Sequence, residues 1–184
     1  MPKNVEVICG DALRVPFPPF TKFVANIPYT ISSPITFKLL DQQFETAIIM
    51  YQWEFAERLV AKCGDENYSR ISVEVYRRCD AEILERVGKE NFWPEPKVDS
   101  AIVRLRPNVK FHVDDEEIFR ALTRAIFNHR RKVARNAIMC ELERIVGDNA
   151  RKRVIDWVKR EKMLERSCLL YTSDAADDGE SVDL

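Results

Sequence analysis

Phe23-Val24-Ala25-Asn26-Ile27-Pro28-Tyr29 joins a short apolar run to a polar turn. An apolar run that stops at Asn-x-Pro-Tyr predicts a β-strand whose end carries a side-chain amide, a backbone carbonyl and an aromatic ring. Pro28 fixes φ and has no N–H to compete for the acceptors. Two acceptors and a stacking face suit the exocyclic amine of a planar base, and such stacking contributes about 1–3 kcal/mol per base. A strand that simply runs into a proline turn is the alternative interpretation.

Outward from this strand, the pattern alternates between strand-like and helix-like segments, which predicts an α/β fold. A helix is expected to begin at Ser33-Pro34, with serine as the N-cap and proline at the first helical position. Residues 47–50 form a continuous apolar run, typical of a strand buried on both faces. The remaining expected elements are strands at 5–8, 22–25, 82–87 and 101–106 and a helix at 54–62.

From Asp114 onward the pattern becomes helical, which predicts a small helical domain at residues 114–167. Acidic residues at 114–117 suit a first helical turn, where the helix dipole favours negative charge. A second helix is expected to end near Gly147, and a third carries Ile155 and Trp157. The apolar stripes of the first two helices consist of Ile118, Leu122, Ala125, Ile126, Val133, Ala137, Ile138 and Leu142.

The positive charge of the chain is concentrated in this helical part. The formal net charge is −1, yet residues 120–166 hold fourteen Lys and Arg against six Asp and Glu, a local net charge of +8. Such clustering is the electrostatic footprint of a surface that meets phosphates, although a solvated basic helix face would have the same composition. The candidate RNA-binding residues are Arg130, Arg131, Lys132 and Arg135.

The cysteine pattern and the hydropathy exclude several other classes of protein. The five cysteines are scattered without a C-x-x-C, and the chain has two histidines, so we expect neither a metal site nor a disulfide framework. No apolar stretch approaches the ~20 residues of a membrane span, and no signal peptide is recognisable before Val5. We therefore expect a cytoplasmic protein.

The last residues differ in character from the rest. Residues 168–184 contain five acids and no Lys or Arg, and residues 168–177 resemble the translation of a sequencing adapter read through in frame. A natural acidic disordered tail would have a similar composition. We expect a non-native tail at 168–184, which would make the chain a gene fragment.

Five segments, in this order and spacing, resemble the ribosomal RNA adenine dimethyltransferases, S-adenosylmethionine-dependent enzymes that dimethylate N6 of adenines. The resemblance covers Val5 to about Arg166, and the Ser-Ser-Pro after Tyr29 is similar to archaeal and eukaryotic members. The segments are Asn26-Ile-Pro-Tyr-Thr-Ile-Ser-Ser-Pro34, residues 52–61 (QWEFAERLVA), 68–73 (YSRISV), 91–105 (NFWPEPKVDSAIVRL) and 127–136 (FNHRRKVARN).

The resemblance implies a fold and a site. It implies a partial class I, Rossmann-like methyltransferase sheet in residues 1–107, followed by a small all-α RNA-binding domain at 114–167. It also implies a helix at 70–78, where the apolar residues alternate as in a strand.

The site residues implied by the resemblance fall into two groups. The adenine group comprises Asn26, the Ile27 carbonyl, Pro28, Tyr29 and, as a second aromatic closing over the base, Phe92. The cofactor group comprises Asp11, which matches the acid that binds the cofactor's adenine amino group, its neighbour Ala12, and again Asn26. Without the family, Asp11 is a turn-forming residue after Gly10, and Phe92 is an ordinary core aromatic.

The glycine-rich turn that holds S-adenosylmethionine in class I methyltransferases has no counterpart, since the five glycines form no G-x-G. We therefore expect an N-terminally truncated fragment. Residues 5–8 should then be a poorly supported edge with an exposed apolar face, or pair non-natively, and the 184-residue chain should not bind S-adenosylmethionine measurably.

The leading functional hypothesis is dimethylation of two neighbouring adenines near the 3′ end of small-subunit rRNA, by a monomer that acts on the pre-ribosomal small subunit. The alternatives are a large-subunit rRNA adenine methyltransferase and a non-catalytic RNA-binding module for ribosome assembly.

Overall fold

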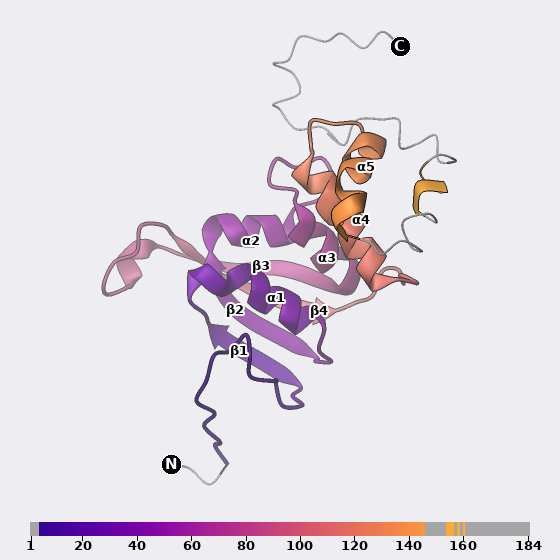
Figure 1. Cartoon of the computed structure of the whole chain (residues 1–184). Helices are drawn as coiled ribbons and strands as arrows, with labels where there is room; N and C mark the ends of the chain where they lie inside the picture. The colour runs from indigo at the N-terminus through magenta and orange to yellow at the C-terminus, as the bar shows by residue number, and fades with distance from the viewer. Residues whose placement is uncertain (1–3, 146–153, 157, 159, 161–184) are drawn as a thin grey trace. The chain divides into compact units, whose positions relative to one another are not determined.

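The computed structural model describes residues 4–145, 154–156, 158 and 160 (Figure 1). The chain divides into two compact units, each described below by itself. The first unit comprises Met1–Val60 and Val75–Val109, and the second comprises Ala61–Glu74 and Lys110–Leu184. The predicted boundaries at 107 and 114 remain predictions. Within the described ranges, no helix is long and apolar enough to cross a membrane.

The first unit is built on a mixed four-stranded sheet with the order β1-β2-β4-β3. β1 is parallel to β2, whereas β4 is antiparallel to both β2 and β3. The strands are β1 (Lys22–Asn26), β2 (Thr46–Gln52), β3 (Cys79–Val87) and β4 (Ser100–Pro107). The α/β class is therefore confirmed, with β3 beginning three residues earlier than the predicted strand at 82–87.

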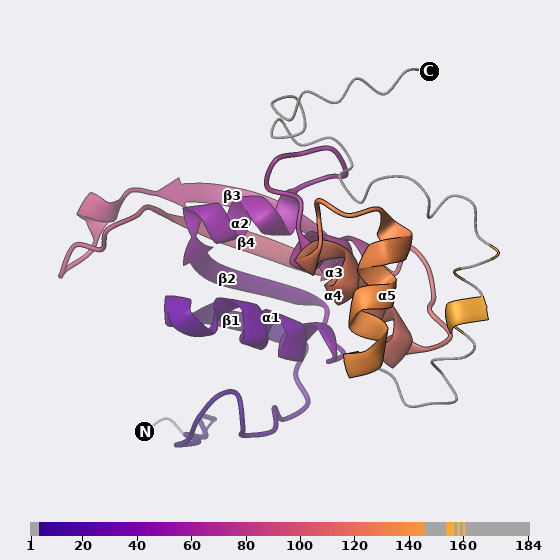
Figure 2. The same ribbon diagram turned by 45° about the horizontal axis from the view of Figure 1, so that its top comes forward.

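Two helices cover one face of this sheet. They are α1 (Ser32–Leu40) and α2 (Trp53–Val60). Both contact Tyr51 of β2, because Thr36 Oγ1 lies 2.8 Å from the Tyr51 hydroxyl and the Phe55 ring centroid lies 5.1 Å from that of Tyr51. Burial raises the pKa of Tyr51, so the phenol stays protonated at neutral pH. Figures 1 and 2 show both helices on the same side of the strands.

The core lies between these helices and the sheet. Three cross-strand pairs of β2 and β4 have no exposed surface on either partner: Ala47 with Leu105, Ile49 with Val103, and Tyr51 with Ala101.

The opposite face of the sheet is only partly covered. Ile48 and Met50 are half-buried, and Val24 of the edge strand β1 is 78% exposed. The prediction that residues 47–50 are buried on both faces was therefore wrong. The physical reason is that α1 and α2 both cover the Tyr51 side of the sheet.

Residues 5–8 form no strand, which corrects a second prediction. Val5, Val7 and Ile8 are 51%, 63% and 52% exposed, and the segment does not pair with the sheet, whose edge is β1. An alternating apolar pattern needs a neighbouring strand to complete its hydrogen bonds, and no described strand supplies one. The expected exposure of these apolar side chains is confirmed.

The second unit is helical where it is described. α4 (Glu116–Asn128) begins after Asp115, whose carboxylate accepts a hydrogen bond from the Ile118 N–H at 3.0 Å. α5 (Ala134–Ile145) follows a short turn. The core of the second unit contains Ile138, Val154 and Val158, with four partly buried residues packed against it: Ile118, Leu122, Ile126 and Ile155. Gly147, Trp157 and the predicted tail at 168–184 lie outside the described residues.

The helix expected at 70–78 is confirmed as α3 (Arg70–Arg78). Its alternating apolar residues would equally suit a strand. Ser69 marks the start of the helix, because its backbone N–H lies 2.9 Å from the Ser72 hydroxyl and its carbonyl accepts the Val73 N–H.

Candidate functional site

The ends of all four strands meet at one edge of the sheet. Because β1 and β2 are parallel, Asn26 and Gln52 end at the same edge. Ser100, the first residue of β4, pairs with Gln52 on one side and with Val87, the last residue of β3, on the other. The turn after Asn26 and the loop that joins β3 to β4 therefore both leave from this edge, which we call the strand-end edge.

The turn after β1 holds the predicted adenine-binding residues in a defined conformation. Pro28 has φ −58° and ψ 132°, and its carbonyl accepts the Ile31 N–H at 3.1 Å, which starts the short 3₁₀ helix Tyr29–Ile31. Ile27 is 9% exposed and anchors the turn, whereas the Asn26 side chain is exposed. The described residues form no hydrogen bond with the Asn26 amide, so it is available to a ligand at the surface.

Tyr29 is tied to the start of β4. Its hydroxyl lies 2.7 Å from Ser100 Oγ, and Ser100 is fully buried. This contact joins residues 71 positions apart, and it restricts the orientation of the half-buried Tyr29 ring. The sequence segment that carries the family resemblance includes Ser100, but no local pattern marks it as the partner of Tyr29.

Phe92 lies on the β3–β4 loop, residues 88–99. The 3₁₀ helix Lys89–Asn91 precedes it, and the Phe92 N–H donates to the Lys89 carbonyl at 3.2 Å. The ring is half-buried, and it makes no ring contact with Tyr29 within the described part of the chain. Both views show the loop extending beyond the sheet (Figures 1 and 2). The structure thus brings Phe92 to the same edge as Tyr29 without placing the two rings face to face.

Asp99 fastens the base of this loop. Its Oδ2 accepts hydrogen bonds from Nε and Nη2 of Arg86, at 2.9 and 2.6 Å, and its Oδ1 accepts the Lys89 N–H at 3.1 Å. The Asp99 carbonyl accepts the Trp53 N–H at 2.9 Å, and the Arg86 guanidinium lies 4.4 Å from the Trp53 ring centroid. The hydrogen bonds from Arg86, followed by that from the Lys89 backbone, lower the pKa of Asp99. No local pattern in the sequence marks this cluster, because Trp53, Arg86 and Asp99 are far apart in the chain.

The residues assigned to the cofactor are engaged in a turn of their own. Asp11 Oδ1 accepts the Leu13 N–H at 2.9 Å, and its Oδ2 lies 3.4 Å from Arg14 Nε. The carbonyls of Ala12, Leu13 and Val15 all accept hydrogen bonds from Lys38 Nζ. Asp11 and Ala12 are exposed, and no glycine-rich turn accompanies them. The assignment of Asp11 and Ala12 to the cofactor stays a prediction.

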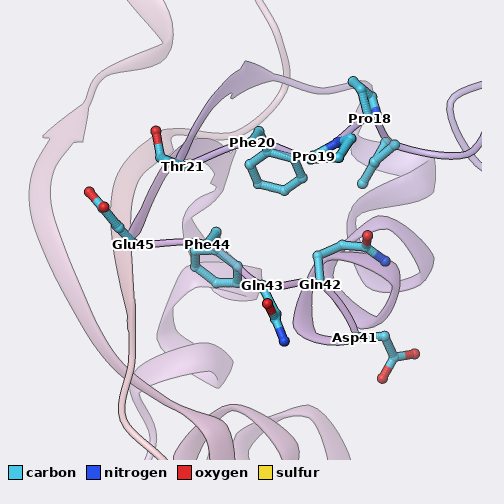
Figure 3. A pocket seen from close by; sticks show the side chains of 10 residues that line it. Pro18, Pro19, Phe20, Thr21, Asp41, Gln42, Gln43, Phe44 and Glu45 are labelled. Atoms are coloured by element: carbon cyan, nitrogen blue, oxygen red, sulfur yellow. The ribbon is translucent and has the colours of Figure 1, made fainter.

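A cavity of about 610 Å³ lies at the other end of β1 (Figure 3). Thr21 and Glu45 line it next to the first paired residues of β1 and β2, and the Phe20 and Phe44 rings stack there with centroids 6.3 Å apart. Since Asn26 ends β1 at the opposite edge, this cavity is separate from the candidate adenine site.

The four predicted RNA-binding residues lie around the turn between α4 and α5 in the second unit. Arg131, Lys132 and Arg135 are exposed, and Lys132 Nζ lies 3.2 Å from Cys140 Sγ. Arg130 differs: it donates to the Tyr68 carbonyl, and its guanidinium lies 5.4 Å from the Phe127 ring centroid. Arg130 therefore holds the 61–74 segment to α4, a structural role that no local sequence pattern indicates.

Among the residues that the structure describes, no group of three or more His, Cys, Asp or Glu side chains is arranged to hold a metal ion.

Sequence comparison relates the chain to rRNA methyltransferases. A protein of Thermococcus sibiricus, described as a probable ribosomal RNA small subunit methyltransferase A, is 52% identical over 136 residues, which are 73% of this chain and 49% of that protein. Its namesake of Methanosarcina acetivorans is 51% identical over 138 residues, 74% of this chain and 51% of that protein. The chain thus spans about half the length of the curated relatives it matches.

Two solved structures resemble this one. A dimethyladenosine transferase from Plasmodium falciparum matches with a TM-score of 0.73 and 34% identity, covering 94% of this chain and 70% of that one. The 23S rRNA methyltransferase ErmE matches with a TM-score of 0.57 and 31% identity, covering 75% of this chain and 57% of that one. The profile of the family "Ribosomal RNA adenine dimethylase" matches residues 1–167, and the chain therefore belongs to the ribosomal RNA adenine dimethylase family.

Proposed function

We propose that this chain provides the adenine-binding part of an enzyme that dimethylates N6 of two neighbouring adenines near the 3′ end of small-subunit rRNA. The observation that carries this proposal is the turn at the strand-end edge, with an exposed Asn26 amide beside a Tyr29 ring tied to Ser100. The relatives described as small-subunit methyltransferases support the choice of RNA.

The target amine is a poor nucleophile because its lone pair is delocalised into the adenine ring. Hydrogen bonds accepted from the two N–H groups by Asn26 Oδ1 and the Ile27 carbonyl would favour a pyramidal nitrogen with a usable lone pair. Pro28 supplies no competing donor, and Tyr29 would hold the plane of the base by stacking. These residues bind and orient the amine, and no acid–base pair is required of them.

The target adenine must leave its base stack, at a cost of about a few kcal/mol. Stacking on Tyr29 offsets part of this cost. Phe92 is proposed as the second aromatic, and this role requires the β3–β4 loop to bring its ring toward Tyr29 when RNA binds.

Phosphate binding is assigned to the second unit. Arg131, Lys132 and Arg135 are exposed, and we propose that they neutralise RNA phosphates. Each such contact releases condensed counterions, so affinity should fall steeply with salt. Arg130 is proposed to contribute less, because it is engaged with Tyr68 and Phe127.

S-adenosylmethionine is the methyl donor that the family implies, and it supplies an already electrophilic methyl group. Asp11 and Ala12 are proposed to contact the cofactor, and we assign no step of the transfer to them, because Leu13 and Lys38 already bond to their turn. We further propose a role in ribosome biogenesis in the cytoplasm, with the pre-ribosomal small subunit as partner and a monomeric enzyme.

The test is a chimera in which residues 1–167 of this chain, the range that the family profile matches, replace the corresponding segment of the Thermococcus sibiricus relative. We expect the chimera to methylate small-subunit rRNA, and Asn26→Ala to abolish methylation while leaving RNA affinity within about twofold. Asn136→Ala, an exposed amide of the same kind in the second unit, serves as the matched control.

The same assay offers large-subunit rRNA as a competing substrate. Methylation of that RNA instead would reject the small-subunit assignment, and an active Asn26→Ala chimera would reject the proposed role of Asn26.

A further inference from the structure

Trp93 is the most exposed large apolar side chain of the described residues, with 98% of its surface accessible. Full exposure of so large a ring is unusual, because burying an aromatic side chain of this size is one of the larger favourable terms in folding. The ring makes no contact with other aromatic or cationic side chains in the described ranges. We propose that Trp93 is a second base platform, on which an unpaired nucleobase of the RNA near the target adenine stacks. This inference rests on the proposed function.

The position of Trp93 supports a role beside the target. Its loop leaves β3 after Val87 and enters β4 at Ser100, the residue bonded to Tyr29. Trp93 therefore lies on the β3–β4 loop, residues 88–99, which starts at the strand-end edge and extends beyond the sheet (Figure 1). We call this loop the arm. A base adjacent to a flipped adenine would pass along such an arm.

The arm is held in shape by its own contacts. Lys89 Nζ lies 2.9 Å from Glu95 Oε1, and the hydrogen bond and charge of Glu95 raise the pKa of Lys89. Asn91 Nδ2 donates to the Gly88 carbonyl at 3.1 Å. Together with the Asp99 cluster at its base, these contacts present the Trp93 ring without burying it. A pre-organised ring loses little conformational entropy when a ligand stacks on it.

The charges of the arm favour a base over a phosphate as the ligand of this segment. Lys89 forms an ion pair with Glu95, and Asp99 forms one with Arg86. Of the remaining charges, the negative charge of Glu90 offsets the positive charge of Lys97. The arm thus has no net positive charge to attract phosphates. The chain neighbours of Trp93 are the half-buried Phe92 and the exposed Pro94, and the exposed polar residues Asn91, Glu95 and Lys97 lie on either side of them. A protein-docking surface would present a larger contiguous apolar patch. A fully exposed aromatic face suits a nucleobase.

The test measures RNA binding by the 184-residue chain itself, using wild type, Trp93→Ala and Trp93→Phe. The probes are a labelled transcript of the 3′-terminal hairpin of small-subunit rRNA and a labelled single-stranded decamer of adenosine. Dissociation constants are measured between 50 and 200 mM salt. We expect Trp93→Ala to weaken binding about 5- to 100-fold at every salt concentration, and Trp93→Phe to retain most of the affinity.

The salt dependence separates stacking from charge. Because stacking releases no counterions, Trp93→Ala should leave the slope of log affinity against log salt unchanged. Arg131→Ala, the matched control, should reduce that slope by about 1. Tryptophan emission should be quenched when RNA binds to wild type and much less in Trp93→Phe.

Any of three results would overturn the proposal. They are an unchanged RNA affinity of Trp93→Ala, a reduced slope of log affinity against log salt in that variant, and the absence of RNA binding by the wild-type chain. Circular dichroism should show that Trp93→Ala folds normally, since the exposed ring packs against nothing described. If the chimera fails to methylate rRNA while Trp93→Ala still weakens binding, the proposed function fails and the base platform stands.

Discussion

At the scale of single residues, the contact between Tyr29 and Ser100 connects the turn after β1 to the first residue of β4. A hydroxyl pair of this kind contributes a modest net free energy, but an orphaned partner in a buried position costs more. Since Ser100 is fully buried, the loss of the Tyr29 hydroxyl leaves its Oγ without that partner.

We therefore predict that Tyr29→Phe lowers the free energy of unfolding by about 1–3 kcal/mol, although the stacking ring remains. In the double variant Tyr29→Phe/Ser100→Ala, the free energy of unfolding should fall by less than the sum of the decreases in the two single variants, because both partners are removed together. Urea unfolding of the four proteins of this cycle checks the prediction, and strictly additive losses would show that the two hydroxyls are not coupled.

At the scale of elements, the β3–β4 loop depends on Asp99 at its base. The carboxylate is ionised above its pKa, which Arg86 and the Lys89 N–H lower from the ordinary value of about 3.9. An acid whose pKa is lower in the folded state stabilises that state above its unfolded pKa. The contribution is lost as the pH falls through the folded pKa.

Asp99→Asn should accordingly increase amide hydrogen exchange in residues 88–98 at pH 7, because Arg86 loses its charged partner. The difference from wild type should shrink below about pH 4 and vanish once the wild-type carboxylate is protonated. Asp80→Asn, on β3 but outside this cluster, serves as the control. Equal exchange rates in Asp99→Asn and wild type at pH 7 would show that the loop is held by other contacts.

At the scale of the whole molecule, the sheet has helices on the Tyr51 face, and its second face is only partly covered. The segment before β1 adds no strand, and its turn at Asp11 is closed by Leu13, Arg14 and Lys38.

We predict that the 184-residue chain shows no measurable heat of binding with S-adenosylmethionine in titration calorimetry. The reason is that Asp11 and Ala12 are engaged in their own turn and no glycine-rich turn accompanies them. The chimera with the Thermococcus sibiricus relative is the positive control. Micromolar binding by the chain alone would mean that the segment rearranges around the ligand.

Local patterns in the sequence were sufficient to predict most of the elements. The strand before Asn26, the presence of a helix near Pro34 and the acidic start of α4 follow from hydrophobic period, proline position and helix-dipole chemistry, which act within a few residues. The predicted N-cap at Ser33 was wrong, because α1 continues from the 3₁₀ helix Tyr29–Ile31 and begins at Ser32, with Ile31 as N-cap and no side-chain cap. The helix at 70–78 needed the family resemblance, because its apolar residues also alternate as in a strand.

The sequence by itself determined the type of most elements and the chemistry of the Asn26–Tyr29 turn, because both depend on neighbouring residues. The tertiary structure alone decided that Tyr29 bonds Ser100, that Asp99 fastens the arm carrying Trp93, and that residues 5–8 join no sheet. These features depend on strand order and register, which bring together residues distant in the chain and leave no periodic signal in the sequence.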